Sequence, residues 1–397
     1  MTPTRRDFIR DMTASAAACL TLGGATFAQS GQEKGKISPA PPKESGAKTP
    51  PSNPAAKPLK VLILGGTGFL GPQTVEPALR RGHTLTLFNR GKTHPGLFPD
   101  IEQIHGDRNT DIKLLAGRSW DVVIDNCGYF PRQVREATDV LKDAVKQYVF
   151  ISSISVYKDN SKPGMDESTP VGRLEDETIE KITGESYGPL KALCEEAAEK
   201  AMPGRVTNIR PGLIVGPGDP SDRFTYWPVR IDRGGEVLAP GAPSDPIQII
   251  DARDLGEWIV KLIEDGTFGV FNAIGPQKEL TIGEMLKSCQ AASSNKSTLT
   301  WADADFLEAQ KVEPWSDMPV WVPPKGDMAG FERVSFAKAV AKGLKYRSID
   351  DTVKATLAWF KTEPAERQAK LKAGIKPERE AEVLKAWHDK QSPSKTP

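Results

Sequence analysis

The chain has 397 residues, of which 53 are basic and 52 acidic, giving a net charge of +1. This balance provides no bulk attraction to nucleic acid, so a nucleic-acid partner is not expected. The four cysteines show no CxxC spacing, which argues against both a metal centre and a disulfide framework.

The first 28 residues have the pattern of an export signal. The pair Arg5-Arg6 opens the segment RRDFIR, and residues 12–28 form a mildly apolar run with small residues at the positions that a signal peptidase reads. This order resembles a twin-arginine signal peptide cleaved after Ala28, which implies a periplasmic or secreted protein. The run is too short and too weakly apolar to stay in a bilayer, so no stable membrane span is expected. An amphipathic N-terminus with a chance arginine pair is the alternative.

Two further segments are not expected to contribute to the folded core. Residues 29–58 are rich in Pro, Ser, Lys and Gly and predict a disordered linker. Residues 363–397 predict a charged C-terminal helix at the periphery, with Trp387 as its only large apolar anchor, and a loose polar tail. Residues 59–362 remain, enough for one large α/β domain with a smaller appendage.

Short apolar runs alternate with helical stretches from residue 59 onward. Helices are predicted after the glycines of residues 65–71 and over about 132–144. Continuous apolar runs that alternate with helices are typical of a parallel sheet covered on both faces. The predicted strands are residues 60–64, 84–88, 101–105, 121–125 and 147–152.

The first predicted strand is followed by the sequence GGTGFLG at residues 65–71. Its glycine spacing, at Gly65, Gly68 and Gly71, is typical of a dinucleotide-binding turn. The first glycine permits a tight turn, the second lets a pyrophosphate approach the helix N-terminus, and the third allows close helix–strand packing. A turn with only a structural role is the alternative.

The end of the second predicted strand bears on the choice of cofactor. An acidic residue about 20 positions after the glycines would hold the ribose of NAD. The chain instead has the neutral Asn89, followed by Arg90 and Lys92, which suit the 2′-phosphate of NADP. We therefore expect NAD(P), with a small preference for NADP, and a solvated basic loop is the alternative. After the third strand, Asp107 is expected near the adenine edge.

Two residues four positions apart carry the expected chemistry. Tyr187 and Lys191 lie on one face of a helix predicted to run toward Ala201. A free tyrosine has a pKa of about 10, and a neighbouring ammonium lowers it by stabilising the phenolate. Lys191 can do this and also hold the nicotinamide ribose, while a serine after the fifth strand polarises the substrate oxygen. An exposed helix face without catalytic function is the alternative.

Together these motifs resemble the extended short-chain dehydrogenase/reductase superfamily, in particular its NAD-dependent epimerase/dehydratase branch, over about residues 59–275. The resemblance implies a doubly wound parallel α/β sheet (Rossmann fold) with a smaller C-terminal substrate domain. The family pattern Ser-x-x-Val-Tyr implies that Ser153 is catalytic, together with Tyr187 and Lys191. The implied cofactor-binding residues are Gly65, Thr67, Gly68, Phe69, Leu70, Gly71, Asn89, Arg90, Asp107, Arg108, Cys127, Gly128, Tyr187, Lys191 and Pro211.

The resemblance also divides the chain and shows where it departs from the family. The expected cofactor domain covers residues 59–212, completed by about 246–275, and the expected substrate-binding region comprises 213–245 and 276–362. Related nucleotide-sugar dehydratases carry Asp-Glu after the catalytic hydroxyl, whereas this chain has Ile154-Ser155, so dehydration of that type loses its acid and base. A polar insertion at 158–180 is expected to form a lid or rim over the pocket.

The substrate side contains an aromatic and basic segment whose role is open. A sugar platform and a packed inter-domain seam are equally consistent with its composition. The segment contributes Arg223, Phe224, Tyr226, Trp227 and Arg230.

The expected function is that of an exported NAD(P)-dependent oxidoreductase or epimerase for a sugar-like or other hydroxyl/carbonyl compound. The periplasm has no obvious NAD(P) pool, so the cofactor is expected to travel with the folded protein and to be regenerated in place. A carbonyl reductase of small metabolites and a non-catalytic protein stabilised by its cofactor are the alternatives. The identity of the small-molecule substrate and the formation of a homodimer stay open.

Overall fold

The structure is a computed structural model that describes Ala55 and residues 57–392. The expected signal peptide (1–28) and nearly all of the expected linker (29–58) therefore lie outside the described residues. None of the described helices is long and apolar enough to cross a membrane.

The centre of the molecule is a seven-stranded parallel sheet with the strand order β10-β6-β5-β4-β1-β2-β3. The chain runs outward from β1 to β3 and then returns to β4 on the other side of β1. This reversal is the topological switch point of a doubly wound sheet, so the predicted fold class is confirmed. The strands are β1 (Lys60–Leu64), β2 (Thr84–Asn89), β3 (Glu102–His105), β4 (Val122–Asp125), β5 (Gln147–Ile151), β6 (Val206–Pro211) and β10 (Gly269–Ala273).

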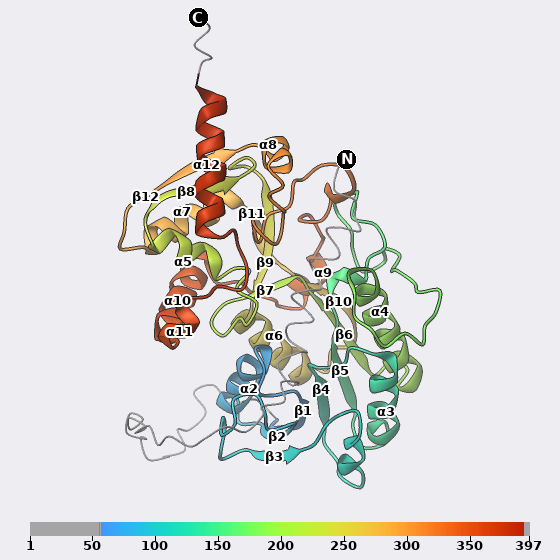
Figure 1. The fold of residues 1–397 in the computed structure, drawn as a ribbon. Helices are drawn as coiled ribbons and strands as arrows, with labels where there is room; N and C mark the ends of the chain where they lie inside the picture. The colour runs from blue at the N-terminus through green and yellow to red at the C-terminus, as the bar shows by residue number, and fades with distance from the viewer. Residues whose placement is uncertain (1–54, 56, 393–397) are drawn as a thin grey trace, which may run out of the picture.

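Helices cover both faces of this sheet (Figure 1). Helices α2 (Leu70–Arg80) and α6 (Ala252–Glu264) pack on one face, and α3 (Pro131–Leu141) and α4 (Gly184–Ala201) on the other. Strand β1 shows the division, because Val61 and Ile63 join the first core while Leu62 and Leu64 join the second. Successive side chains of a strand point to opposite faces, which explains why the apolar runs are continuous.

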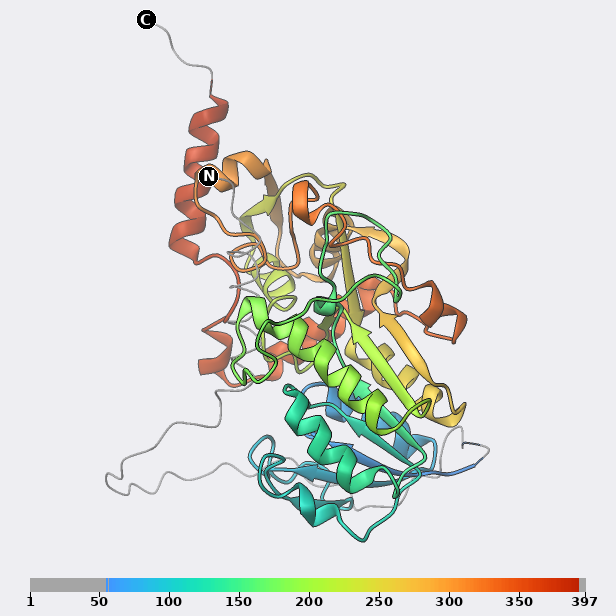
Figure 2. The same ribbon diagram turned by 90° about the vertical axis from the view of Figure 1, so that its right-hand side faces the viewer.

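A second, smaller region lies beyond the carboxyl ends of the strands (Figures 1 and 2). It contains a three-stranded sheet of order β11-β9-β7 and a two-stranded sheet of β12 and β8. Its strands are β7 (Leu213–Val215), β8 (Gly235–Pro240), β9 (Pro246–Asp251), β11 (Gly275–Thr281) and β12 (Ser297–Ala302). Its helices are α5 (Tyr226–Asp232), α7 (Ile282–Ala292), α8 (Ala304–Ala309), α10 (Ile349–Thr362), α11 (Ala365–Gln368) and α12 (Pro377–Gln391). The short helix α9 (Ala337–Ala341) packs instead beside β10 of the large sheet.

The C-terminal helix α12 packs against the core of the second region. Its Val383 and Leu384 are buried in the core of that region, in addition to the contact between Trp387 and Phe306. The carboxylate of Glu380 is buried as well, and it accepts a hydrogen bond from the backbone N–H of Leu238 at 3.0 Å. The helix therefore contributes to the core through more than the one aromatic side chain that its sequence suggests.

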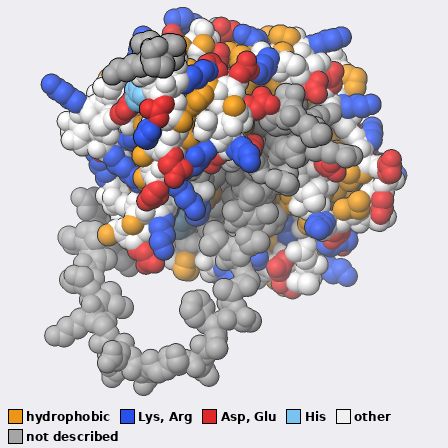
Figure 3. Space-filling model, turned by 45° about the horizontal axis from the view of Figure 1, so that its top comes forward, with side chains coloured by type: hydrophobic (Ala, Val, Ile, Leu, Met, Phe, Trp, Pro, Cys, Tyr) orange, Lys and Arg blue, Asp and Glu red, His pale blue; other side chains and the backbone are white. Residues whose placement is uncertain are grey.

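Short 3₁₀ turns complete the chain, at η1 (Ile112–Leu115), η2 (Ile154–Val156) and η3 (Gly326–Met328). On the face shown in Figure 3, acidic and basic side chains are intermixed across the surface, in keeping with the small net charge.

Candidate active site

The glycine-rich turn joins β1 to α2 at the carboxyl edge of the sheet. A Cβ at Gly71 would lie 2.4 Å from the carbonyl group of Gly66, so only glycine allows the helix to start this close to the turn. At Gly68, by contrast, a Cβ would meet no atom within 4 Å. No side chain caps α2 at Phe69, although the N–H of Gly71 already donates to the Gly68 carbonyl oxygen at 2.8 Å and Pro72 has no N–H. A helix N-terminus of this kind favours an anion such as a pyrophosphate.

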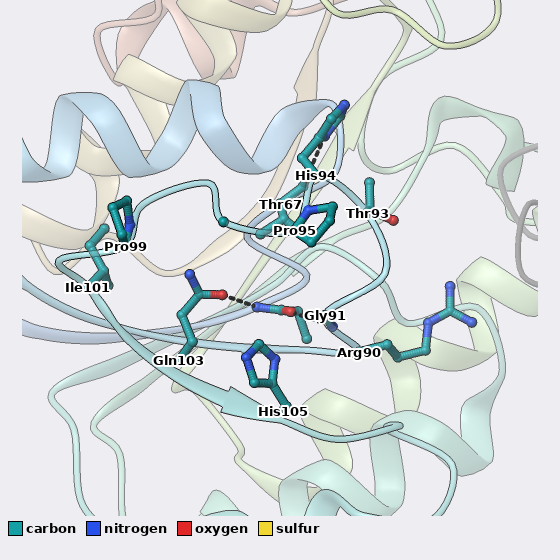
Figure 4. A pocket seen from close by; sticks show the side chains of 12 residues that line it. Thr67, Arg90, Gly91, Thr93, His94, Pro95, Pro99, Ile101, Gln103 and His105 are labelled. Carbon is teal, nitrogen blue, oxygen red and sulfur yellow. Dashed lines mark hydrogen bonds between the residues drawn. The ribbon is translucent and has the colours of Figure 1, made fainter. Parts of the chain in front are cut away.

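A cavity of about 590 Å³ lies beside this turn, at the ends of β2 and β3 (Figure 4). The side-chain amide of Asn89 is hydrogen-bonded within the protein. Its Oδ1 accepts from the Gly91 N–H at 2.8 Å, and its Nδ2 donates to Gln103 at 3.0 Å. The exposed Arg90 extends away from Gln103, at the edge of the cavity. The lining residues are Thr67, Asn89, Arg90, Gly91, Thr93, His94, Pro95, Gly96, Pro99, Ile101, Gln103 and His105.

Asp107 and Arg108, two of the expected cofactor-binding residues, differ in orientation. Asp107 follows β3 and its Oδ1 accepts from the backbone N–H and the side-chain amide of Asn109, both at 2.9 Å. Arg108 is instead buried and donates to both oxygens of Asp125, at 2.7 and 3.0 Å. Burial alone would raise the pKa of Asp125, but Arg108 outweighs it and holds that pKa below its ordinary value. The structure thus places Arg108 beneath the site, where it supports the end of β4.

The segment after β4 brings unpaired polar atoms to the same edge. Cys127 lies against the glycine turn, because a Cβ at Gly65 would be 3.2 Å from its Sγ. Both amide atoms of Asn126 and the Oγ of Ser152 are buried without a hydrogen-bond partner. Buried polar groups normally have partners, so these atoms, at the ends of β4 and β5, fit a polar ligand such as a dinucleotide. Two other such atoms, in Asp219 and Thr225, belong to the segment after β7.

Lys191 projects from α4 to the ends of β4 and β5. Its Nζ donates to the carbonyl oxygens of Gly128 at 2.7 Å and Ile151 at 2.6 Å, and it lies 4.3 Å from the ring centroid of Phe150. The side chain is only 3% exposed, and this burial lowers the pKa of Lys191. An ammonium has three donors, so one remains beyond the two backbone bonds.

Ser153 and Tyr187 belong to two elements that pack against each other: Ser153 starts η2, and Tyr187 lies in the first turn of α4. The Oγ of Ser153 accepts from the Ser155 N–H at 3.1 Å and so starts η2. A Cβ at Gly188 would lie 1.9 Å from the carbonyl oxygen of Ser155, which shows how closely α4 approaches this turn. The half-buried Tyr187 precedes Gly188 in this same turn of α4. The three expected catalytic residues therefore belong to the contacting elements η2 and α4, and their roles stay a prediction.

A buried polar network behind η2 and α4 was not apparent from the sequence. Glu195, one helical turn after Lys191, receives two hydrogen bonds from Arg210 of β6, at 2.7 and 2.9 Å. Arg210 also donates to the hydroxyl of Tyr157, which in turn donates to Asn272. Burial raises the pKa of Tyr157 despite the nearby Arg210. The network fixes α4 against β6 and β10, and no local motif signals it because its members are far apart in sequence.

The expected substrate segments are mostly turned into the protein. Trp227 is fully buried and donates its indole N–H to the Pro319 carbonyl at 2.6 Å, and Phe224 and Tyr226 lie in the same core. These aromatic rings therefore pack inside the core of the second region, so they form neither an exposed sugar platform nor an inter-domain seam. Pro211, the last residue of β6, pairs with Ala273 of β10. Among the described residues, no group of three or more His, Cys, Asp or Glu side chains is arranged to hold a metal ion.

Comparison with known proteins agrees with this geometry. A chloroplast stem-loop binding protein of 41 kDa from Arabidopsis thaliana is 25% identical over 265 residues, which cover 59% of this chain and 63% of that protein. Among solved structures, the Bordetella bronchiseptica enzyme WbmH in complex with NAD+ aligns with a TM-score of 0.57 at 16% identity, over 77% of this chain and 99% of that one. The human epimerase family protein SDR39U1 with NADPH aligns with a TM-score of 0.51 at 20% identity, over 75% and 99%.

These structural similarities show the fold, while the family follows from the sequence itself. Residues 61–273 match the model of one family, and that span runs from β1 to the end of β10. The chain belongs to the NAD dependent epimerase/dehydratase family.

Proposed function

We propose that the protein is an NAD(P)-dependent epimerase or oxidoreductase that acts on a hydroxyl or carbonyl carbon of a sugar-like substrate. The observation that carries this proposal is the placement of Lys191 at the ends of β4 and β5, next to the contact between η2 and α4, which carry Ser153 and Tyr187. A bound nicotinamide would accept or supply the hydride. Buried beside two backbone carbonyls, Lys191 keeps one donor that we assign to a ribose hydroxyl, while its charge acts on the tyrosine.

Each catalytic residue has a distinct role in this proposal. Tyr187 takes the proton from the substrate hydroxyl, or returns it to the carbonyl oxygen, and the charge of Lys191 makes its phenolate accessible near neutral pH. Ser153 donates a hydrogen bond to the same substrate oxygen while charge develops there. Ile154 and Ser155 offer no carboxylate after the catalytic hydroxyl, which favours epimerisation or simple redox chemistry over dehydration.

The ends of β2 and β3 support NADP as the cofactor. Asn89 cannot accept from both ribose hydroxyls in the way that a free carboxylate would, because its Oδ1 already accepts from Gly91. The adjacent cavity of about 590 Å³ has Arg90 and Thr93 on its lining, which suits an additional phosphate group. His105 lines the same cavity and adds a further group that can donate a hydrogen bond to it, whereas Nδ1 of His94 already pairs with the Thr67 carbonyl oxygen at 3.0 Å.

We further propose that the enzyme is exported with its cofactor bound. The motif around Arg5-Arg6 supports the twin-arginine route, which carries proteins that are already folded. A cofactor that cannot be exchanged outside the cytoplasm must return to its starting redox state in each turnover. Transient oxidation during epimerisation meets that requirement, whereas a net reductase needs a second substrate to complete the cycle.

The test begins with the full chain purified from the cell envelope fraction. Mass spectrometry of the released small molecules is expected to find NADP or NAD, and addition of candidate nucleotide-linked or free sugars is expected to change the nicotinamide absorbance transiently. Continuous consumption of added NADPH with small carbonyl compounds would identify a reductase instead. A chain that neither carries nor binds a nicotinamide nucleotide would refute the proposal.

Two non-catalytic alternatives give different outcomes in the same experiment. A protein that is only stabilised by its cofactor would retain the nucleotide without any change of its redox state. An RNA-binding role is suggested by the name of the plant relative and by the sequence FNRGK at residues 88–92, which resembles chloroplast RNA-binding proteins. The net charge of +1 offers no electrostatic support for it. Binding of a stem-loop RNA at physiological salt would favour that alternative.

A further inference from the structure

The insertion between η2 and α4 has two halves that are held very differently. The first half is fixed to the segment after η3 by backbone hydrogen bonds from Gly330 to Asn160 and from Gly164 to Arg333, at 2.8 and 2.7 Å. The carboxylate of Glu167 accepts from the backbone N–H of Asn272 at 2.8 Å. This half is therefore part of the folded body and packs away from the glycine turn.

The second half, residues 173–182, is called the strap below. Within the described part of the chain, its residues make no backbone–backbone hydrogen bond with any other segment, and most of its side chains are exposed. Two ion pairs hold it, together with a hydrogen bond from the Ser186 hydroxyl of α4 to the Lys181 carbonyl oxygen at 2.6 Å. Near its start Arg173 contacts Glu196 of α4 at 2.5 Å, and near its end Glu180 contacts Arg132 of α3. Segments with few backbone bonds and high exposure open at low free-energy cost.

The contact between Glu180 and Arg132 is the better-formed of the two. Both carboxylate oxygens are used, with Nε–Oε1 at 2.7 Å and Nη2–Oε2 at 2.9 Å. Arg132 also reaches Asn109, beside the expected adenine edge, at 3.3 Å. The hydrogen bond to Glu180 raises the pKa of the Arg132 guanidinium.

The position of this contact gives the strap its significance. Helix α3 begins three residues after Gly128, whose carbonyl accepts from Lys191, and the strap leads directly into the turn of α4 that carries Tyr187. The strap thus runs from Glu196 in the second half of α4, past Arg132 in the first turn of α3, to the start of α4. The unpaired amide of Asn126 lies at the end of β4, on the carboxyl edge of the sheet.

We propose that the strap is a gate for the nicotinamide cofactor and that the pair of Glu180 and Arg132 is its latch. The proposal rests on the proposed function for the identity of the ligand. With the latch closed, the strap holds the dinucleotide in its groove, and opening of the latch precedes both entry and release. Such a gate would keep the cofactor in an enzyme that works where no replacement is available.

The test measures both binding rates, because a gate and a direct contact affect them differently. NADPH and NADH are the probes, loaded on the full chain and displaced by excess oxidised nucleotide while the nicotinamide fluorescence is followed. Glu180→Gln is expected to raise the rates of association and of release by about two- to fivefold each, the range for an exposed ion pair. The dissociation constant should change little. High salt should accelerate release more in the wild type than in the variant, which keeps only the pair of Arg173 and Glu196.

A matched control uses the same arginine. Glu136 also pairs with Arg132, at 3.1 Å, but belongs to α3 and not to the strap, so Glu136→Gln should leave both rates at the wild-type values. Equal acceleration in both variants, wild-type rates in Glu180→Gln, or a change of the release rate alone would overturn the gate.

A second measurement does not depend on the ligand. Hydrogen exchange of the backbone amides of residues 173–182 should accelerate in Glu180→Gln and stay unchanged in Glu136→Gln. If the wild type binds neither nucleotide, the proposed function fails while this experiment still decides whether the latch holds the strap. Unchanged exchange in Glu180→Gln would reject the latch even where nucleotide binding succeeds.

Discussion

Two regions of the molecule contain side chains of the kind that binds ligands, and the structure uses them in opposite ways. At the carboxyl edge of the large sheet, Tyr187 is half-buried, Lys191 retains a donor, and Gly68 faces open space. In the second region, the aromatic rings of Phe224 and Trp227 are buried in a core. Residue type alone therefore does not mark a site. A position at the carboxyl end of a parallel strand does mark a site, because neighbouring strands there connect in opposite directions and leave a crevice for a ligand.

The sharpest test of this contrast is a substitution at the edge that spares the fold. Tyr187→Phe removes one hydroxyl from a half-buried ring, so thermal stability and cofactor affinity should hardly change. Hydride transfer should fall by roughly 10²–10⁴-fold, the usual share of a positioned acid/base. Single-turnover redox change of the bound nicotinamide measures it. A wild-type rate would remove Tyr187 from the catalytic assignment and place the proton transfer elsewhere.

The second region should respond in the reverse manner. Trp227→Ala empties a fully buried site and removes the hydrogen bond to Pro319, so the free energy of unfolding should drop by about 3–5 kcal/mol. The folded fraction should keep the wild-type turnover. Denaturant unfolding measures the free energy of unfolding, and the reaction rate divided by the concentration of folded protein measures the turnover. A large increase of KM at unchanged stability would show that the aromatic segment contacts substrate after all.

A smaller effect is expected at the cavity beside β2. If Arg90 holds the 2′-phosphate of NADP, Arg90→Ala should weaken NADP binding by about 1.5–3 kcal/mol, the scale of a charge-assisted hydrogen bond, and leave NAD binding nearly unchanged. Titration of both nucleotides against wild type and variant measures the difference. An equal loss of affinity for both nucleotides, or no loss for either, would show that Arg90 does not bind the 2′-phosphate.

The smallest effect concerns pH and a buried histidine far from the site. Burial lowers the pKa of His83 below its ordinary value, although Glu264 at 2.9 Å opposes this. The unfolded chain therefore binds the proton more readily than the folded one. Stability from this group is complete above about pH 6.5 and declines as the pH falls below it. The melting temperature between about pH 7.5 and 5 should fall less steeply in His83→Gln than in the wild type.

The sequence predicts the first half of the fold well, because its signals are local. The strands predicted at 60–64 and 121–125 correspond to β1 and β4 within one residue, and the helix that carries Tyr187 ends at Ala201 as expected. Apolar runs and glycine spacing are read within a few residues of each other, so no tertiary information is needed.

Contacts between distant residues could not be anticipated in this way. Arg108 follows a strand at a position that could face either a ligand or the interior. Only the assembled sheet shows that its guanidinium is buried and donates to the carboxylate of Asp125. The same holds for Arg210 and Glu195, which no spacing rule connects. The strap contact to Arg132 depends on how an insertion folds back across two helices.

The helix α12 has a consequence for the order in which the chain can fold. The large sheet is complete once β10 has been made, at residue 273. The core of the second region is not complete then, because the N–H of Leu238 finds its acceptor in Glu380, 142 residues later. During synthesis the cofactor half can therefore assemble while the other half waits for the final helix to leave the ribosome. A chain that stops before residue 377 would present a finished dinucleotide-binding sheet beside an open apolar core, which makes truncated copies recognisable to cellular proteolysis.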